Sequence, residues 1–325
     1  MIKKFAKALR QHKILGLISH VNPDGDTIGS QLALYNWLTQ NGIDALLFND
    51  DPVPPNLVWL AHQEKIRVAD AKMLDQCDGF LFVDGNHPSR FGAMSDYFEK
   101  TDKPVYLIDH HPDPPHQFFR EKLWDAGVSS TACLVYTLYK ETGLGKINKE
   151  TAEALYSGIV TDTGSFRFAS VTAETHFIIG DIIKIGGLSP SEIHERIYDD
   201  KNLSQYQLLG LVLQNIRLHC NNQVATIYVT QEMLTETGCI LDDLEGFVNY
   251  PLSIKGVLVS VIFYERDDLV KISLRGKSAI DLNKTARVFQ GGGHFNAAGA
   301  WLPGPLEKAI PKVVAEIASR IEGQK

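Results

Sequence analysis

Acidic and imidazole side chains recur in four short segments in the first half of the chain. The segments are H-V-N-P-D-G-D (20–26), F-V-D-G-N (82–86), I-D-H-H (108–111) and T-D-T-G (161–164). If their carboxylates share one crevice, the mutual repulsion is costly unless cations neutralise it. Carboxylate and imidazole ligands suit Mn²⁺ or Mg²⁺ better than a thiol-seeking metal, and a carboxylate that bridges two ions is the usual two-metal arrangement. The imidazoles favour Mn²⁺, with Mg²⁺ as the alternative.

The first of these segments also has a simpler interpretation. Asn22-Pro23-Asp24-Gly25 is strong turn sequence, and such a turn can direct His20 and both carboxylates inward. Taken alone, Asp26 could serve only as the N-cap of the following helix, because Asp is a preferred N-cap residue. The other three segments shift the balance towards a metal site.

Short apolar runs precede three of the segments and predict the strands that position them. The runs are Ile14–Ser19, Gly79–Val83 and Pro104–Ile108, and amphipathic segments alternate with them, beginning with a helix over about Asp26–Asn41. This rhythm predicts an α/β fold, a mostly parallel sheet with helices on its faces. Such sheets bind ligands outside the carboxyl ends of their strands, so the three strand ends should point to one crevice.

The second half of the chain predicts a different organisation. Strands return from about Ile216, and Asn221-Asn222 forms a hairpin turn between two of them. We therefore expect a larger α/β domain over 1–200, a linker helix over 201–215 and a smaller α+β domain over 216–325. Helices are predicted between the two sheets at about Ser129–Thr142, with Ser129 or Ser130 as its N-cap, Lys149–Asp162, with Asn148 as its N-cap, Ala173–Ile185, Pro190–Tyr198 and Leu203–Asn215.

Composition and charge exclude several classes of protein. The 32 Lys and Arg against 39 Asp and Glu give a formal net charge of −7, which argues against a broad basic surface for long duplex nucleic acid but allows a short strand or a nucleotide. The four cysteines lie far apart, without a C-x-x-C pair, so a thiolate zinc site and a disulfide scaffold are not indicated and a reducing cytoplasm is expected. No apolar run approaches the roughly 20 residues of a membrane span.

In their order along the chain, the four segments resemble the motifs of the DHH phosphoesterase family. The run G-G-G-H-F-N-A-A-G-A (291–300) is similar to the DHHA1 domain that follows the DHH domain in that family. The resemblance covers nearly the whole chain and implies an active site in the cleft between the two domains. The two-domain length and the segment S-L-R-G-K (273–277) resemble the branch that acts on short oligonucleotides, the nanoRNases and phosphatases of 3′-phosphoadenosine-5′-phosphate (pAp).

The resemblance also implies roles for individual residues. It implies two Mn²⁺ ions that share Asp84, with Asp109 orienting a histidine through its ring N–H and His111 facing the scissile phosphate as a ligand or proton donor. One ion would be held by His20, Asp24 and Asp84, and the other by Asp26, Asp84, His110 and Asp162. The residues implied to bind substrate are Arg275, Gly292, Gly293 and His294.

The glycine run and one arginine have alternatives of their own. A run of glycines alone is usually a flexible turn, although its N–H groups can bind an anion. Relatives commonly carry a further glycine where this chain has Gln290. Arg90 is interpreted as a structural residue, in preference to a phosphate ligand.

These observations predict a cytoplasmic Mn²⁺-dependent phosphoesterase. It would release 5′-mononucleotides from short single-stranded RNA and convert pAp to AMP, without a long duplex or a membrane as partner. The enzyme alternatives are a phosphodiesterase of cyclic or linear dinucleotides and a pyrophosphatase or exopolyphosphatase, and the non-enzyme alternative is a nucleotide-binding scaffold. A homodimer agrees with base rates, since soluble oligomers are mostly symmetric homo-oligomers, and nothing in the sequence itself indicates it.

Overall fold

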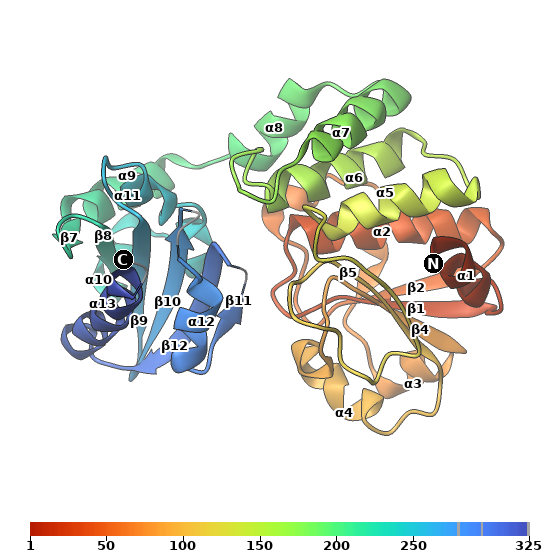
Figure 1. Ribbon diagram of the computed structural model, residues 1–325, viewed down its shortest axis with the longest axis horizontal. Helices are drawn as coiled ribbons and strands as arrows, with labels where there is room; N and C mark the ends of the chain where they lie inside the picture. Colours follow the sequence, from red (N-terminus) through yellow and green to blue (C-terminus); the bar gives the residue numbers. More distant parts are fainter. Residues whose placement is uncertain (278–279, 294, 324–325) are drawn as a thin grey trace. The chain divides into compact units, whose positions relative to one another are not determined.

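The computed structural model describes residues 1–277, 280–293 and 295–323. The chain divides into two compact units, Met1–Asp200 and Lys201–Lys325 (Figure 1). Within the described residues, none of the helices combines the length and the apolar character that crossing a bilayer requires.

The first unit is built on a six-stranded sheet in which every neighbouring pair is parallel. The strand order is β3-β2-β1-β4-β5-β6, so the order reverses between β1 and β4, the position where open α/β sheets bind ligands. The predicted α/β fold is thereby confirmed. The strands are β1 (Ile14–Ile18), β2 (Asp44–Phe48), β3 (Ile66–Arg67), β4 (Gly79–Val83), β5 (Val105–Asp109) and β6 (Glu121–Trp124).

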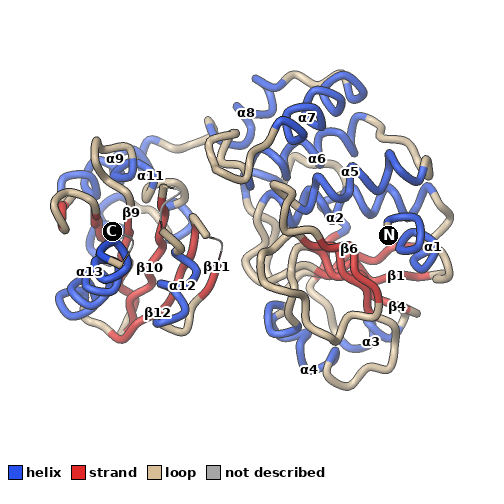
Figure 2. The backbone as a smooth tube through the Cα atoms, in the orientation of Figure 1, coloured by secondary structure: helices blue, strands red, loops and turns tan. Residues whose placement is uncertain are grey.

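Helices cover both faces of this sheet (Figure 2). On one face, α1, α2 and α5–α8 enclose the largest core, which holds Trp37 fully buried. On the other face, α3 and α4 close a second core, in which Phe82 packs edge-on against Phe91 and Phe98. The helices are α1 (Ile2–Leu9), α2 (Gly25–Gln40), α3 (Ala71–Asp75), α4 (Ser95–Phe98), α5 (Thr131–Thr142), α6 (Lys149–Asp162), α7 (Ala173–Gly186) and α8 (Pro190–Tyr198).

Glycines let α2 and α6 approach each other closely. A Cβ atom on Gly29 of α2 would collide with the backbone carbonyl of Ala154 in α6, and a Cβ on Gly158 of α6 would lie 3.4 Å from the Cα of Asp26 in α2. Because no side chain separates the two backbones at these positions, the start of α2 and the end of α6 lie at the same edge of the sheet.

Two of the helices begin at the N-cap residues that the sequence predicts. Ser130 caps α5 and Asn148 caps α6.

The second unit has a mixed six-stranded sheet in the order β11-β12-β10-β9-β8-β7. The pair β8–β9 is parallel and the other pairs are antiparallel. The predicted hairpin at Asn221-Asn222 joins β7 and β8, and both turn residues have positive φ. The strands are β7 (Arg217–His219), β8 (Val224–Val229), β9 (Val259–Arg266), β10 (Leu269–Gly276), β11 (Gly292–Gly293) and β12 (Ala297–Pro303).

Five helices belong to the described part of the second unit. α12 and α13 pack on one face of its sheet, whereas the range 201–215, which the sequence assigns to a linker, forms α9 and buries Leu208 and Val212 against the other face. The alternative that the glycine run is only a flexible turn is wrong for Gly292 and Gly293, because both pair with β12 as a short edge strand. The helices are α9 (Leu203–Gln214), α10 (Gln231–Thr237), α11 (Asn249–Leu252), α12 (Leu282–Val288) and α13 (Leu306–Glu322).

Candidate active site

Three neighbouring strands of the first sheet end in the residues that the motifs single out. His20 follows β1, Asp84 follows β4, and Asp109 is the last residue of β5, with His110 and His111 behind it. Because β1, β4 and β5 are adjacent and parallel, these residues gather at one edge of the sheet. The start of α2 and the end of α6 add Asp24, Asp26 and Asp162 to the same group.

The turn between β1 and α2 fixes the first two residues. Asp24 is the N-cap of α2 and accepts a hydrogen bond from the backbone N–H of Thr27 at 3.0 Å. The alternative that Asp26 caps this helix is therefore wrong, because Asp26 already lies inside its first turn. His20 donates its Nδ1–H to the carbonyl of Val21 at 2.7 Å, which leaves Nε2 as the nitrogen that faces the carboxylates.

Asp84 stands at the centre of the group. It is 2% exposed, and its carboxylate accepts hydrogen bonds from the hydroxyls of Thr27 at 2.9 Å and Thr131 at 2.8 Å. Burial alone would raise the pKa of Asp84, but its hydrogen bond with His20 and the imidazoles of His111 and His110 hold that pKa well below its usual range. Its φ of 61° is a left-handed conformation, which Asp adopts more readily than most residues.

Asp26 and Asp162 approach the group from the two closely packed helices. Asp26 accepts hydrogen bonds from the backbone N–H groups of Thr131 at 2.6 Å and Ala132 at 2.8 Å, at the start of α5. Burial raises the pKa of both Asp26 and Asp162 well above the usual range, and neighbouring carboxylates raise both further. The first unit therefore gathers more buried carboxylate than it neutralises with its own side chains.

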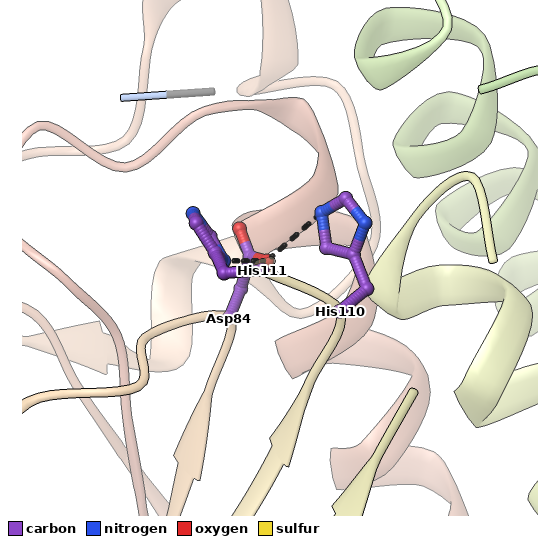
Figure 3. Close-up of side chains that lie close together, drawn as sticks. All are labelled: Asp84, His110 and His111. Carbon is purple, nitrogen blue, oxygen red and sulfur yellow. Dashed lines mark ion pairs between the residues drawn. The ribbon is translucent and has the colours of Figure 1, made fainter. Parts of the chain in front are cut away.

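His110 lies between these carboxylates. It donates its Nδ1–H to the carbonyl of Val128 at 3.4 Å, and its Nε2 lies 3.3 Å from Asp162 Oδ2, 3.7 Å from Asp84 Oδ1 and 3.8 Å from Asp26 Oδ2. Figure 3 shows the Asp84 carboxylate between His110 and His111. A backbone acceptor on one ring nitrogen fixes the tautomer and turns the other nitrogen towards a ligand, as in metal-binding histidines generally.

His111 is held by a different set of partners. Its Nδ1 donates to Asp109 Oδ1 at 2.7 Å, and its Nε2 lies 2.8 Å from Arg90 Nη1 and accepts from that guanidinium. Burial lowers the pKa of His111 to about 3, so the imidazole is neutral and can accept from Arg90. Asp109 thus lies behind His111 and orients it.

Among the described residues, three groups of side chains could hold a metal ion, and within each group the ligand atoms lie within 4.8 Å of one another. The first group is His20, Asp24 and Asp84. Asp84 belongs also to the second group, and His110 belongs to both the second and the third. Hard carboxylate oxygens with imidazole nitrogens fit a divalent cation such as Mn²⁺ or Mg²⁺. Such a cation would offset the burial and the mutual repulsion that raise the pKa of Asp26 and Asp162. The second and third groups are Asp84, His110 and His111, and Asp26, His110 and Asp162.

The residues expected to bind substrate lie in the second unit. Arg275 stands near the end of β10, donates to the carbonyl of Leu274 at 3.0 Å and is half-buried. Burial lowers the pKa of its guanidinium, while Glu245 nearby opposes that shift. Gly292 and Gly293 form the edge strand β11, where a Cβ on Gly293 would collide with the carbonyl of Ala297. His294 lies outside the described residues.

Sequence reasoning did not find Thr27 and Thr131 and placed Arg90 among structural residues. Thr27 directly follows Asp26, and its hydroxyl also lies 2.7 Å from His20 Nε2, which the turn sequence alone does not reveal. Thr131 reaches Asp84 from 47 residues further along the chain. Arg90 has a structural role, as predicted, but the side chain that it contacts is His111 of the candidate site.

Comparison with known proteins confirms the resemblance seen in the motifs. A model of the N-terminal domain of the DHH family matches residues 15–159, and a model of the DHHA1 domain matches residues 221–323. A relative from Thermus thermophilus, named bifunctional oligoribonuclease and PAP phosphatase NrnA, is 30% identical over 94% of this chain and 89% of its own. A relative of the same name from Bacillus subtilis is 31% identical over 86% and 87%.

Solved structures agree with this comparison. An exopolyphosphatase-related protein from Bacteroides fragilis superposes with a TM-score of 0.90 at 32% identity, covering 98% of this chain and 96% of its own. RecJ from Thermus thermophilus in complex with Mn²⁺ has a TM-score of 0.55 at 16% identity and covers 98% of this chain and 54% of its own. The latter likeness is one of fold.

Proposed function

Because this chain belongs to the DHH family and carries the N-terminal DHH domain together with a DHHA1 domain, we propose that it hydrolyses short oligoribonucleotides to 5′-mononucleotides and dephosphorylates pAp to AMP. The enzyme is a hydrolase that acts on phosphoric ester bonds. The names of the two relatives support the substrates. The observation that carries the chemistry is the position of Asp84, which two of the three ligand groups share.

The proposed cofactor is a pair of Mn²⁺ ions, with Mg²⁺ as the alternative. His20, Asp24 and Asp84 would hold one ion, and the second would be held by Asp26, Asp84, His110 and Asp162. Bound there, the two ions supply an activated water and neutralise the charge that develops on the phosphoryl oxygens.

The side chains prepare the site for that chemistry. Asp84 receives the hydroxyls of Thr27 and Thr131, which fix both of its oxygens. His20 and His110 each give one ring N–H to a backbone carbonyl, so each directs Nε2 into the group of carboxylates. His111 is aligned by Asp109 and Arg90, and we assign to it the place beside the scissile phosphate, as a ligand or, once Nε2 takes up a proton in place of its hydrogen bond from Arg90, as the proton donor.

The second unit is proposed to bind the substrate. Arg275 supplies a planar guanidinium that suits bidentate phosphate recognition, and Gly292 and Gly293 supply backbone without side chains. His294 is part of the same proposal on the basis of the family motif. The proposal keeps short single strands and pAp as substrates, a cytoplasmic enzyme and a homodimer, and the free thiols of all four cysteines fit a reducing compartment.

The test is hydrolysis of five substrates in parallel with Mn²⁺. An RNA dinucleotide, pAp, a 24-nucleotide RNA, a cyclic dinucleotide and inorganic polyphosphate would be incubated with the wild-type protein and with Asp84→Ala as the blank. Rapid loss of the dinucleotide and pAp, with the long RNA largely intact, is the expected result. Preferred turnover of polyphosphate, which the name of the Bacteroides fragilis protein brings into consideration, or of the cyclic dinucleotide would overturn the substrate assignment.

A further inference from the structure

One face of the second sheet is only partly covered by the described helices. α12 and α13 pack on the opposite face. On this face α9 and α11 pack over β8 and β9, where Ile227, Ile262 and Tyr264 are buried, and α11 also reaches β10. On β10 and β12 the side chains of the same face are exposed or half-buried. We call this surface the exposed strip, and it consists of Lys271, Ser273, Arg275, Ala297, Gly299 and Trp301.

The two strands pair the residues of the strip in register. Lys271 lies opposite Trp301, Ser273 opposite Gly299, and Arg275 opposite Ala297. The Nζ atom of Lys271 lies 5.8 Å from the centroid of the Trp301 ring, and Trp301 is 43% exposed. The strip therefore has an aromatic ring and a cation at one end, a guanidinium at the other, and small side chains between them.

This arrangement matches the chemistry of a single-stranded nucleic acid. Every base has a π-face that stacks on an exposed aromatic ring regardless of sequence, and cations beside the ring contact the phosphates. Open sheet faces with exposed aromatics bind RNA in this manner. Lys271 is an exposed cation on a chain whose formal net charge is −7, whereas Arg275 also faces Glu245. Charge complementarity at Lys271 therefore favours an anionic ligand over an apolar protein surface.

The length of the strip indicates the size of the ligand. Lys271 and Arg275 are four residues apart on one strand, which corresponds to about 13 Å. A ligand that contacts both ends is an oligomer, since a single nucleotide with its base on Trp301 does not extend along the strand to Arg275. Small residues at Ser273, Ala297 and Gly299 leave the surface between the ends low enough for a sugar-phosphate backbone to cross.

We propose that the exposed strip binds single-stranded oligoribonucleotides, with a base stacked on Trp301 and a phosphate at Lys271. This inference rests on the proposed function and deepens it, because it assigns to the oligomers a contact that pAp does not make. Trp301 and Lys271 then contribute to the recognition of oligonucleotides and leave the hydrolysis of pAp unchanged, whereas Arg275 also serves the substrate site already proposed.

The experiment compares binding with turnover in the full-length chain. Fluorescence anisotropy of a labelled pentanucleotide in the presence of EDTA measures affinity without hydrolysis, and steady-state kinetics with Mn²⁺ measure KM for the pentanucleotide and for pAp. The variants are Trp301→Ala, Trp301→Phe and Lys271→Ala. Tyr250→Ala, which removes an exposed aromatic ring outside the strip, is the matched control.

The proposal predicts a selective loss. Trp301→Ala should weaken pentanucleotide binding by about 5- to 100-fold and leave KM for pAp unchanged, whereas Trp301→Phe keeps most of the affinity. Lys271→Ala should lower the salt dependence of log K by roughly 0.7 per log unit of salt. The control should bind as the wild type does.

Other outcomes overturn the proposal. Unchanged pentanucleotide affinity in Trp301→Ala, an equal loss for pAp and the pentanucleotide, or a change of oligomeric mass in light scattering without a change in RNA affinity would each refute a role in RNA binding. The proposed function fails separately, if the wild-type protein hydrolyses neither substrate. Anisotropy in EDTA tests the strip even in that case.

Discussion

The edge of the first sheet and the exposed strip of the second sheet are the two surfaces where we propose that anionic ligands bind, and they are built in different ways. At the first edge, Asp26, Asp84 and His110 are all buried. The two carboxylates accept hydrogen bonds from α2 and α5, and His110 donates to a loop carbonyl. On the strip, Lys271 and Trp301 are exposed and are aligned only by the register of two strands. The comparison indicates that reacting atoms need fixed, buried partners, whereas ligands of varying length need an open surface.

The largest effect is expected from Asp84→Ala, at the edge of the first sheet. Loss of a carboxylate that two ligand groups share should lower pAp turnover and Mn²⁺ affinity by well over about 100-fold, since changes in residues behind metal ligands already cost about 10- to 100-fold. Mn²⁺ titration calorimetry and phosphate release measure the two quantities. Asp181→Asn, a carboxylate that binds Lys140 and Tyr136 at the surface, serves as the control. Two ions bound with retained turnover would exclude Asp84 as the shared ligand.

A smaller effect of a different kind is expected from Arg275→Ala. A hydrogen bond to a charged group contributes about 1.5–3 kcal/mol, so KM should rise by about tenfold or more while kcat changes little, because uniform binding of ground and transition states affects KM alone. Arg275→Lys should restore only part of the affinity, since Lys does not reproduce the planar fork. If kcat falls and KM stays constant, Arg275 belongs to the chemistry and the comparison between the two sheets breaks down.

A substitution of Arg90 tests whether a residue that contacts the buried group only through His111 also affects turnover. Arg90→Ala removes the donor to His111 Nε2, and we expect kcat to fall by about tenfold with Mn²⁺ affinity unchanged. Comparing the pH profile of kcat with that of the wild type distinguishes positioning of His111 from a general loss of fold, which thermal unfolding checks independently. A pure rise in KM would instead make Arg90 a phosphate ligand.

The smallest expected effect is that the stabilisation of the folded protein by Mn²⁺ depends on pH. The raised pKa values of Asp26 and Asp162 mean that the folded metal-free protein retains protons that the unfolded chain releases. Its free energy of unfolding should therefore fall as pH rises from the ordinary Asp value of 3.8 through the raised pKa values. Because cations displace those protons, the increase in Tm caused by Mn²⁺ should grow from pH 5 to pH 8, by about 2–4 °C per kcal/mol.

Calorimetric scans with EDTA or Mn²⁺ at each pH measure this dependence. Asp162→Asn should flatten it, because the variant lacks one of the two carboxyls that titrate. If the increase in Tm caused by Mn²⁺ is the same from pH 5 to pH 8, no protons leave the site when the metal binds.

The sequence predicted the fold of the first unit because its central strands are continuous apolar runs that end in polar clusters. His20, Asp84 and Asp109 were located by that rule alone, since parallel strands end at one edge. The edge strands β3 and β6 were not predicted, because two to four residues without a clear period carry little signal. β11 was not predicted because glycine disfavours strands, and only the pairing with Gly299 and Ala298 makes these residues one.

The residues that support the site were harder to find for a related reason. Thr131 and Arg90 act through contacts with Asp84 and His111 that depend on how α5 and the loop after β4 pack. Such contacts leave no spacing pattern in a single sequence. The family resemblance supplied the candidate ligand residues, but it did not supply the hydrogen-bond donors that hold them.

The left-handed backbone at Asp84 has a consequence for the evolution of this chain. Glycine adopts such a φ without steric cost, and a single-base transition converts either Asp codon into a Gly codon. The conformation of residue 84 therefore gives no protection against this replacement, and the loss of the carboxylate would be opposed only by selection for turnover. In lineages that no longer need the activity, position 84 should be among the first of the site to drift.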